Sequence, residues 1–86
     1  MAIAYVLINS DLGSDEAIIA ETKNILSDQS EIQYEIQGVY GVFDVVLKLI
    51  SEDAANLRSV ITNKIRRIPQ VQSTLTMMVI DEQEKS

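Results

Sequence analysis

The densest group of residues able to do chemistry is the stretch QGVYGVFD at residues 37–44. It holds two of the three glycines of the chain, Gly38 and Gly41, and it ends in Asp44, whose neighbours are apolar. Glycine permits a positive φ or the close approach of another group to the backbone. A carboxylate among apolar side chains costs solvation unless it meets hydrogen-bond donors or a cation. The stretch therefore predicts either an ordinary hairpin turn or a small binding loop in which Asp44 has a polar partner.

Enzymatic and metal chemistry are restricted by the absence of both cysteine and histidine. Without them the chain has no thiolate nucleophile, no imidazole acid–base pair, and no imidazole or thiolate metal site. Asp44 and the tyrosine hydroxyls are the only acid–base set that remains. Glu31 and Glu35 stand on alternate strand positions, with no further carboxylates at a metal-ligand spacing. We therefore predict no catalytic residue, no metal site and no cofactor.

The charge and the N-terminal sequence limit the partners. A formal net charge of −6 and a pI near 4.4 oppose contact with phosphate backbones, and no basic arm offsets them. The apolar N-terminal stretch ends after Ile8, which is too short for a signal-peptide core or a membrane span. We expect a cytoplasmic protein that binds neither nucleic acid nor membranes.

The hydrophobic pattern predicts the elements that must position the loop, in the order β-α-β-β-α-β. Strands are expected at residues 2–9, 31–38, 42–50 and 71–80, and helices at residues 15–28 and 53–67. Ser14 is expected to cap the first helix, Ser51 or Asp53 the second, and Pro69 to end it. The basic residues Lys64, Arg66 and Arg67 are interpreted as complementing the negative end of that helix, with docking of an acidic partner as the alternative.

This order is that of a ferredoxin-like α+β sandwich with a four-stranded antiparallel sheet. The first and third strands are apolar on both faces, so we place them at the centre of the sheet. The helices cover one sheet face, and the apolar side chains of the other face predict a dimer that packs sheet to sheet. Residues 1–80 are expected to form one domain, and the acidic residues 81–86 a flexible tail.

Four stretches of the chain together carry a resemblance to a known family: AYVLI at 4–8, GVYGVFDVVLKL at 38–49, NKIRRIPQV at 63–71 and STLTMMVI at 73–80. In this order they resemble the effector-binding domain of the Lrp/AsnC transcription regulators, also called the RAM domain. The spacing of glycine, aromatic and aspartate in GVFD is the most specific of these features, and the ST-x-T pattern of the last strand supports it. The resemblance covers essentially the whole chain.

The resemblance implies a domain that forms dimers and then larger assemblies, often octamers of four dimers. Members of the family bind small effectors, usually amino acids, at the contact between dimers. The effector-binding residues that it implies are Gly38, Tyr40, Gly41 and Asp44 of the loop and Thr74 and Thr76 of the last strand.

One departure from the family changes the expected function. The regulators carry an N-terminal helix-turn-helix domain that reads DNA, whereas this sequence starts directly at the first sheet strand. It therefore resembles a stand-alone effector domain, which would modulate transcription regulation of amino acid metabolism without direct DNA binding. Such a protein could act alone or mix into assemblies with full-length Lrp/AsnC regulators.

Two other functions are compatible with the same architecture. One is an ACT-like regulatory subunit of a metabolic enzyme, which also binds amino acids at interfaces. The other is a small dimeric ferredoxin-like enzyme, which the absence of histidine and cysteine disfavours. A co-purifying biosynthetic enzyme would support the first, and turnover by the isolated protein the second.

Overall fold

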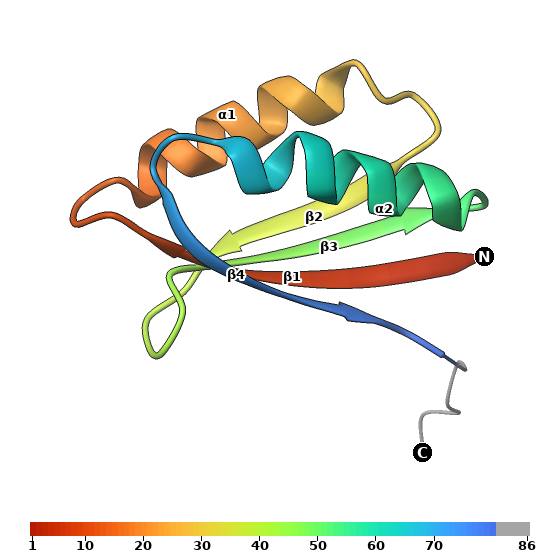
Figure 1. Cartoon of the computed structure of the whole chain (residues 1–86). Helices are drawn as coiled ribbons and strands as arrows, with labels where there is room; N and C mark the ends of the chain where they lie inside the picture. The colour runs from red at the N-terminus through yellow and green to blue at the C-terminus, as the bar shows by residue number, and fades with distance from the viewer. Residues whose placement is uncertain (81–86) are drawn as a thin grey trace.

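The computed structural model describes residues 1–80, whose strands and helices follow the predicted order. The strands are β1 (Ala2–Ser10), β2 (Gln33–Gly38), β3 (Val45–Ser51) and β4 (Val71–Met78). The helices are α1 (Asp15–Ser27) and α2 (Ala54–Asn63), and a 3₁₀ turn, η1 (Ile65–Arg67), follows α2. Both helices lie on the same side of the sheet (Figure 1). The acidic tail expected at residues 81–86 lies outside the described residues.

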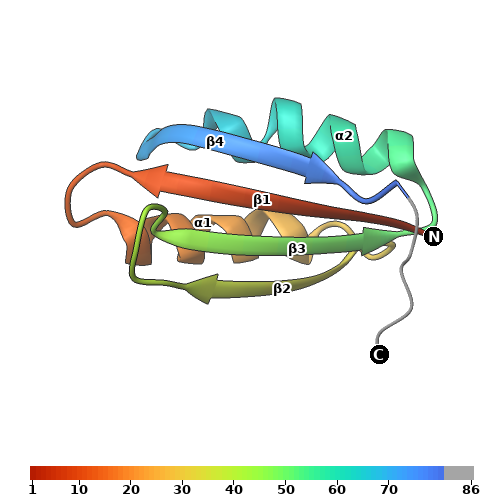
Figure 2. The ribbon, with the colours of Figure 1, turned by 90° about the horizontal axis from the view of Figure 1, so that it is seen from below.

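The sheet has the strand order β2-β3-β1-β4, and all of its neighbouring strands are antiparallel. Figure 2 shows this order from the side that the helices do not cover. The central position of β1 and β3 confirms the prediction made from their apolar character. The ferredoxin-like α+β fold is likewise confirmed. Neither helix within residues 1–80 is long and apolar enough to cross a membrane.

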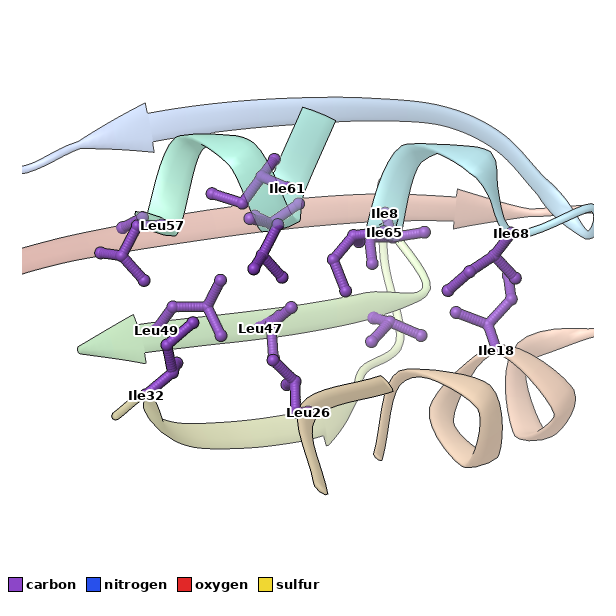
Figure 3. Close-up of a cluster of buried hydrophobic side chains, with 14 residues drawn as sticks. Ile8, Ile18, Leu26, Ile32, Leu47, Leu49, Leu57, Ile61, Ile65 and Ile68 are labelled. Carbon is purple, nitrogen blue, oxygen red and sulfur yellow. The ribbon is translucent and has the colours of Figure 1, made fainter. Parts of the chain in front are cut away.

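The hydrophobic core lies between the sheet and the two helices. Alternate residues of the central strands point into it, because successive side chains of a strand face opposite sides. These residues are Ala4, Val6, Ile8, Val45, Leu47 and Leu49. Figure 3 shows side chains of both helices, among them Leu26 and Ile61, in one cluster with Leu47 of β3. Truncating one such side chain to alanine costs about 2–5 kcal/mol, so this layer supplies much of the stability.

The starts of the two helices differ from each other. Asp53 caps α2 as predicted, because its carboxylate accepts a hydrogen bond from the backbone N–H of Asn56 at 3.1 Å. The Ser51 hydroxyl in turn accepts from the backbone N–H of Asp53, also at 3.1 Å. The expected cap of α1 is wrong, since the Ser14 side chain makes no capping hydrogen bond. Ser14 has φ −103° and ψ 7°, outside the extended region from which a capping hydroxyl reaches the first turn.

The end of the second helix is also corrected. The sequence predicts one helix over residues 53–67, but α2 ends at Asn63 and Lys64 leaves helical geometry. The tighter 3₁₀ turn that follows places residues three apart on the same side. Ile65 and Ile68 are both buried as a result, and packing of this pair accounts for the change of helix type.

The sheet face away from the helices is called the open face below. Its apolar residues are Ile3, Tyr5, Leu7, Val46, Ile50, Leu75 and Met77, placed there by strand alternation and register. Leu75 and Met77 on β4 are 48% and 46% exposed. Lys48 lies among these residues, with its Nζ atom 3.8 Å from Glu35 Oε2 and 5.8 Å from the centroid of the Tyr5 ring. An apolar surface of this kind on one subunit is typical of an interface.

Candidate functional site

Asp44 closes the loop between β2 and β3 and has its polar partner within the chain. Its Oδ2 atom accepts hydrogen bonds from the backbone N–H of Ser10 at 2.9 Å and from the Ser10 hydroxyl at 3.2 Å. The backbone N–H of Asp44 donates to the carbonyl of Ile8 at 3.0 Å. These bonds tie the loop to the end of β1. Within residues 1–80 no donor reaches Oδ1, so one oxygen of the half-buried carboxylate remains open to a ligand.

Residues 39–44 leave the sheet, and β3 therefore begins at Val45 instead of at the predicted residue 42. A hydrogen bond from the Val39 N–H to the Asp44 carbonyl, 2.8 Å long, closes the base of the loop. At its tip the Tyr40 side chain is fully solvent-exposed and Val42 is largely exposed. An exposed tyrosine and valine at the end of a closed loop give a protruding contact surface.

The two glycines of the loop have different structural roles. Gly41 has a φ of +154°, which side-chain-bearing residues rarely adopt, and a Cβ there would meet nothing within 4 Å. The conformation of the backbone, and not close packing, therefore calls for glycine at this position. Gly38 has no positive φ, and a Cβ there would lie 3.5 Å from Ile19 Cδ1, an ordinary contact distance. The expected glycine conformation is confirmed at Gly41 alone.

The two threonines implied by the family resemblance lie across the sheet from Gly38, where β2 ends. Thr74 pairs with Ile8, which pairs with Val45, which pairs with Gly38. Three strand spacings of about 4.8 Å separate the ends of this row by about 14 Å. Thr74 is half-buried and Thr76 is exposed on the edge strand β4. One chain therefore does not bring Gly38 and the threonines together, whereas Asp44, which is hydrogen-bonded to Ile8, lies one strand closer to Thr74.

A groove lies beside Thr76, between α2 and β4. It has a volume of about 240 Å³ and is lined by Arg58, Ile61, Thr62, Arg66, Thr76 and Met78. We call it the arginine groove. In Figure 2, α2 runs alongside β4 behind the edge of the sheet, which is where these residues meet. Of its lining, only Thr76 belongs to the residues predicted for the site.

The sequence contains a pattern that could have predicted one wall of the arginine groove. Arg58, Thr62 and Arg66 follow one another at intervals of four, one position after the buried row of Leu57, Ile61 and Ile65. Residues four apart share a helix face, so the polar row borders the buried row. What the sequence could not supply was the strand that faces this row, because β4 is next to α2 only in the folded chain.

Comparison with known proteins gives a family and a set of solved structures. The sequence matches the family model described as Lrp/AsnC ligand binding domain over residues 3–86. No curated protein sequence matches the chain. Among solved structures, FFRP-DM1 shares 30% sequence identity at a TM-score of 0.75, and the match covers 93% of this chain and 100% of that one.

Two transcription regulators share the fold at lower identity. AsnC of E. coli has 21% identity and a TM-score of 0.75, with 99% of this chain and 54% of that chain covered. The regulator NMB0573 of Neisseria meningitidis, solved as a complex with L-Met, has 13% identity and a TM-score of 0.70, with 99% of this chain and 53% of that chain covered. The described fold therefore corresponds to about half of each regulator.

Proposed function

We propose, because the chain belongs to the Lrp/AsnC ligand-binding domain family, that it is a non-enzymatic effector-binding and oligomerisation module whose effector is an amino acid. The match over residues 3–86 is the observation that carries the proposal. The L-Met complex of the Neisseria regulator supports the choice of an amino acid as the ligand class. The module would modulate transcription regulation of amino acid metabolism.

The effector site of this proposal is shared between subunits. The loop residues Gly38, Tyr40, Gly41 and Asp44 of one subunit would meet Thr74 and Thr76 of a neighbour. The separation of about 14 Å between Gly38 and Thr74 supports this division for the glycine end of the loop, because one chain alone does not bring Gly38 to the threonines. The exposed side chains of Tyr40 and Thr76 are accessible to a neighbouring subunit.

Each end of a zwitterionic amino acid has a suitable partner in this arrangement. Oδ1 of Asp44 is open and would accept from the ammonium group, while Oδ2 stays bound to Ser10. The hydroxyls of Thr74 and Thr76 would donate to the carboxylate. A ligand bound between dimers contacts the loop of one subunit and the threonines of its neighbour. It therefore has a higher affinity for the larger assembly than for the separate dimers, and its binding shifts the equilibrium toward that assembly.

The assembly itself would begin with a sheet-to-sheet dimer through the open face and continue to a larger ring, an octamer in the form usual for the family. The net charge of −6 supports a role without direct DNA contact. Mixing with full-length Lrp/AsnC regulators would give the module access to DNA through its partner.

The test combines light scattering with calorimetric titration of each of the twenty common amino acids. We expect a mass above that of a dimer, and a mass or thermal stability that responds to a small subset of the amino acids. Asp44→Asn should weaken binding about tenfold, because it removes the charge facing the ammonium group. Its amide oxygen still accepts from Ser10, which separates ligand binding from folding.

A Ser10→Ala variant is the matched control, since it removes one bond to Oδ2 and leaves the Asp44 charge in place. We expect it to keep ligand affinity within about twofold. An assembly whose mass and stability are indifferent to all twenty amino acids would contradict the proposal.

A further inference from the structure

The arginine groove has the features of a binding site for a small organic acid. We propose that it recognises the carboxylate of a small acid with a short apolar side chain. The proposal deepens the proposed function. It rests on that function for one point, the identification of the bound acid as the effector amino acid. It adds Arg58 and Arg66, which are not among the effector-binding residues expected from the sequence; for Arg66 the sequence offered docking of an acidic partner as an alternative role.

The charges of the groove support an anionic ligand. Arg58 and Arg66 both line it, and within residues 1–80 neither forms an ion pair with an acidic side chain. This is notable in a chain with 13 acidic and 7 basic residues, where acidic partners outnumber basic ones. A guanidinium presents a planar fork of donors that matches a carboxylate with two parallel hydrogen bonds.

The hydroxyls of the groove add neutral donors beside the two cations. Thr62 lies one helical turn after Arg58 on α2, Arg66 follows in η1, and Thr76 reaches the groove from β4. A carboxylate bound by one guanidinium still has lone pairs for such hydroxyls. The groove therefore offers donors from both of its walls, as recognition of a compact anion requires.

The apolar part of the lining determines which kind of side chain the bound acid can have. Ile61 is only 3% exposed, and Met78 is half-buried on the opposite strand. Methionine adapts its shape to the group that it contacts. The volume of about 240 Å³ lies below the range of about 300–1,000 Å³ that suits drug-sized ligands. A small metabolite with a branched or unbranched aliphatic side chain fits this chemistry.

Large polyanions fit the groove poorly. The chain carries a net charge of −6, which repels an extended phosphate backbone at long range. The two arginines of the groove interact with a ligand only at contact distance. A single carboxylate can therefore form a bidentate contact with a guanidinium without approaching the acidic side chains elsewhere on the surface.

The test is calorimetric titration of the full chain with three probe sets: the twenty common amino acids, 4-methylpentanoate, and leucinamide. The first set includes leucine, 4-methylpentanoate lacks the ammonium group of leucine, and leucinamide lacks its carboxylate. The double variant Arg58→Gln/Arg66→Gln should lower the affinity for carboxylate-bearing probes about tenfold or more. Leucinamide should bind the unchanged protein at least about tenfold more weakly than leucine.

A matched control is available in the same segment. Lys64→Gln/Arg67→Gln removes the same amount of positive charge close to Arg66 in the sequence, but neither substituted residue lines the groove. We expect it to keep affinity within about twofold. All four side chains are exposed, so circular dichroism and thermal unfolding should match the unchanged protein for both variants.

The outcomes separate this inference from the proposed function. If an amino acid binds and the groove double variant retains its affinity, the inference is overturned and the proposed function stands. If no amino acid binds but 4-methylpentanoate binds in an arginine-dependent way, the inference stands and amino-acid sensing fails. If no probe binds, both are overturned.

Discussion

The carboxylate of Asp44 is divided between two environments. Ser10 holds one of its oxygens through a backbone and a hydroxyl donor, which anchors the loop to the end of β1. The other oxygen has no donor within residues 1–80 and is available to a ligand. The same residue thus contributes to folding and to the proposed site, so a test of binding needs a variant that preserves the bond to Ser10.

Thr22 is a second residue whose surroundings lead to a prediction. It is fully buried on α1, and its hydroxyl has no hydrogen-bond partner within the described residues. Valine has the same shape without the desolvated hydroxyl. Thr22→Val should therefore raise the free energy of unfolding by about 1 kcal/mol, measured by urea denaturation at fixed protein concentration.

The control for this change is Thr62→Val, which alters an exposed threonine of α2. We expect its effect on unfolding to remain within about 0.5 kcal/mol. A loss of stability in Thr22→Val would mean that the buried hydroxyl has a partner in solution, and the prediction would be wrong.

The N-termini of the two helices are stabilised by different hydrogen bonds. Asp53 makes a side-chain cap to Asn56, whereas Ser14 is held by its backbone, whose N–H donates to the Asp11 carbonyl at 2.9 Å. The turn that brings Ser14 to this position uses Gly13 with a φ of +76°. The conformation of the chain before each helix, and not the type of the capping residue alone, determines whether the helix starts with a side-chain cap or with a backbone hydrogen bond.

This difference predicts unequal effects of two similar substitutions. Asp53→Ala should lower the free energy of unfolding by about 1 kcal/mol, because it leaves the N–H of Asn56 without its acceptor. Ser14→Ala should change it by less than about 0.5 kcal/mol. Thermal and urea unfolding of both variants give the comparison, and equal losses would show that Ser14 caps α1 in solution.

The molecule as a whole has one covered and one open sheet face. The helices bury the first face, while the open face carries an apolar centre with Lys48 held beside Glu35 and Tyr5. A domain of 86 residues buries roughly 60–65% of its unfolded surface, which leaves little stability to spare. Covering the open face with a second subunit would add to that stability.

Leu75→Asp tests the open face as the dimer interface. A sheet-to-sheet dimer would place this carboxylate in an apolar contact, where it lacks a partner. We expect at least about a tenfold weaker dimer and a lower melting temperature, measured by light scattering and analytical ultracentrifugation over a range of concentrations. Ala20→Asp, which adds the same charge on the exposed side of α1, should leave the mass unchanged. A full-size assembly in Leu75→Asp would exclude the open face.

The order of elements, the sheet fold and the identity of the central strands could be predicted from the sequence. These follow from local periodicity and from which strands are apolar on both faces, and both are properties of a few consecutive residues. The sequence also located the β2–β3 loop and the glycine conformation at Gly41. The end of α2 at Asn63 was not predicted from the sequence, because the joint burial of Ile65 and Ile68 depends on the residues that they pack against.

The contacts between residues of different elements were visible only in the folded chain. The tertiary structure gave Asp44 its partner Ser10, placed Gly38 and Thr74 at opposite edges of the sheet, and placed β4 beside α2 and η1 to form the arginine groove. Each of these contacts joins residues from different elements, and their distances depend on strand order and register. Such distances are set by packing of the whole chain, which no local pattern in the sequence encodes.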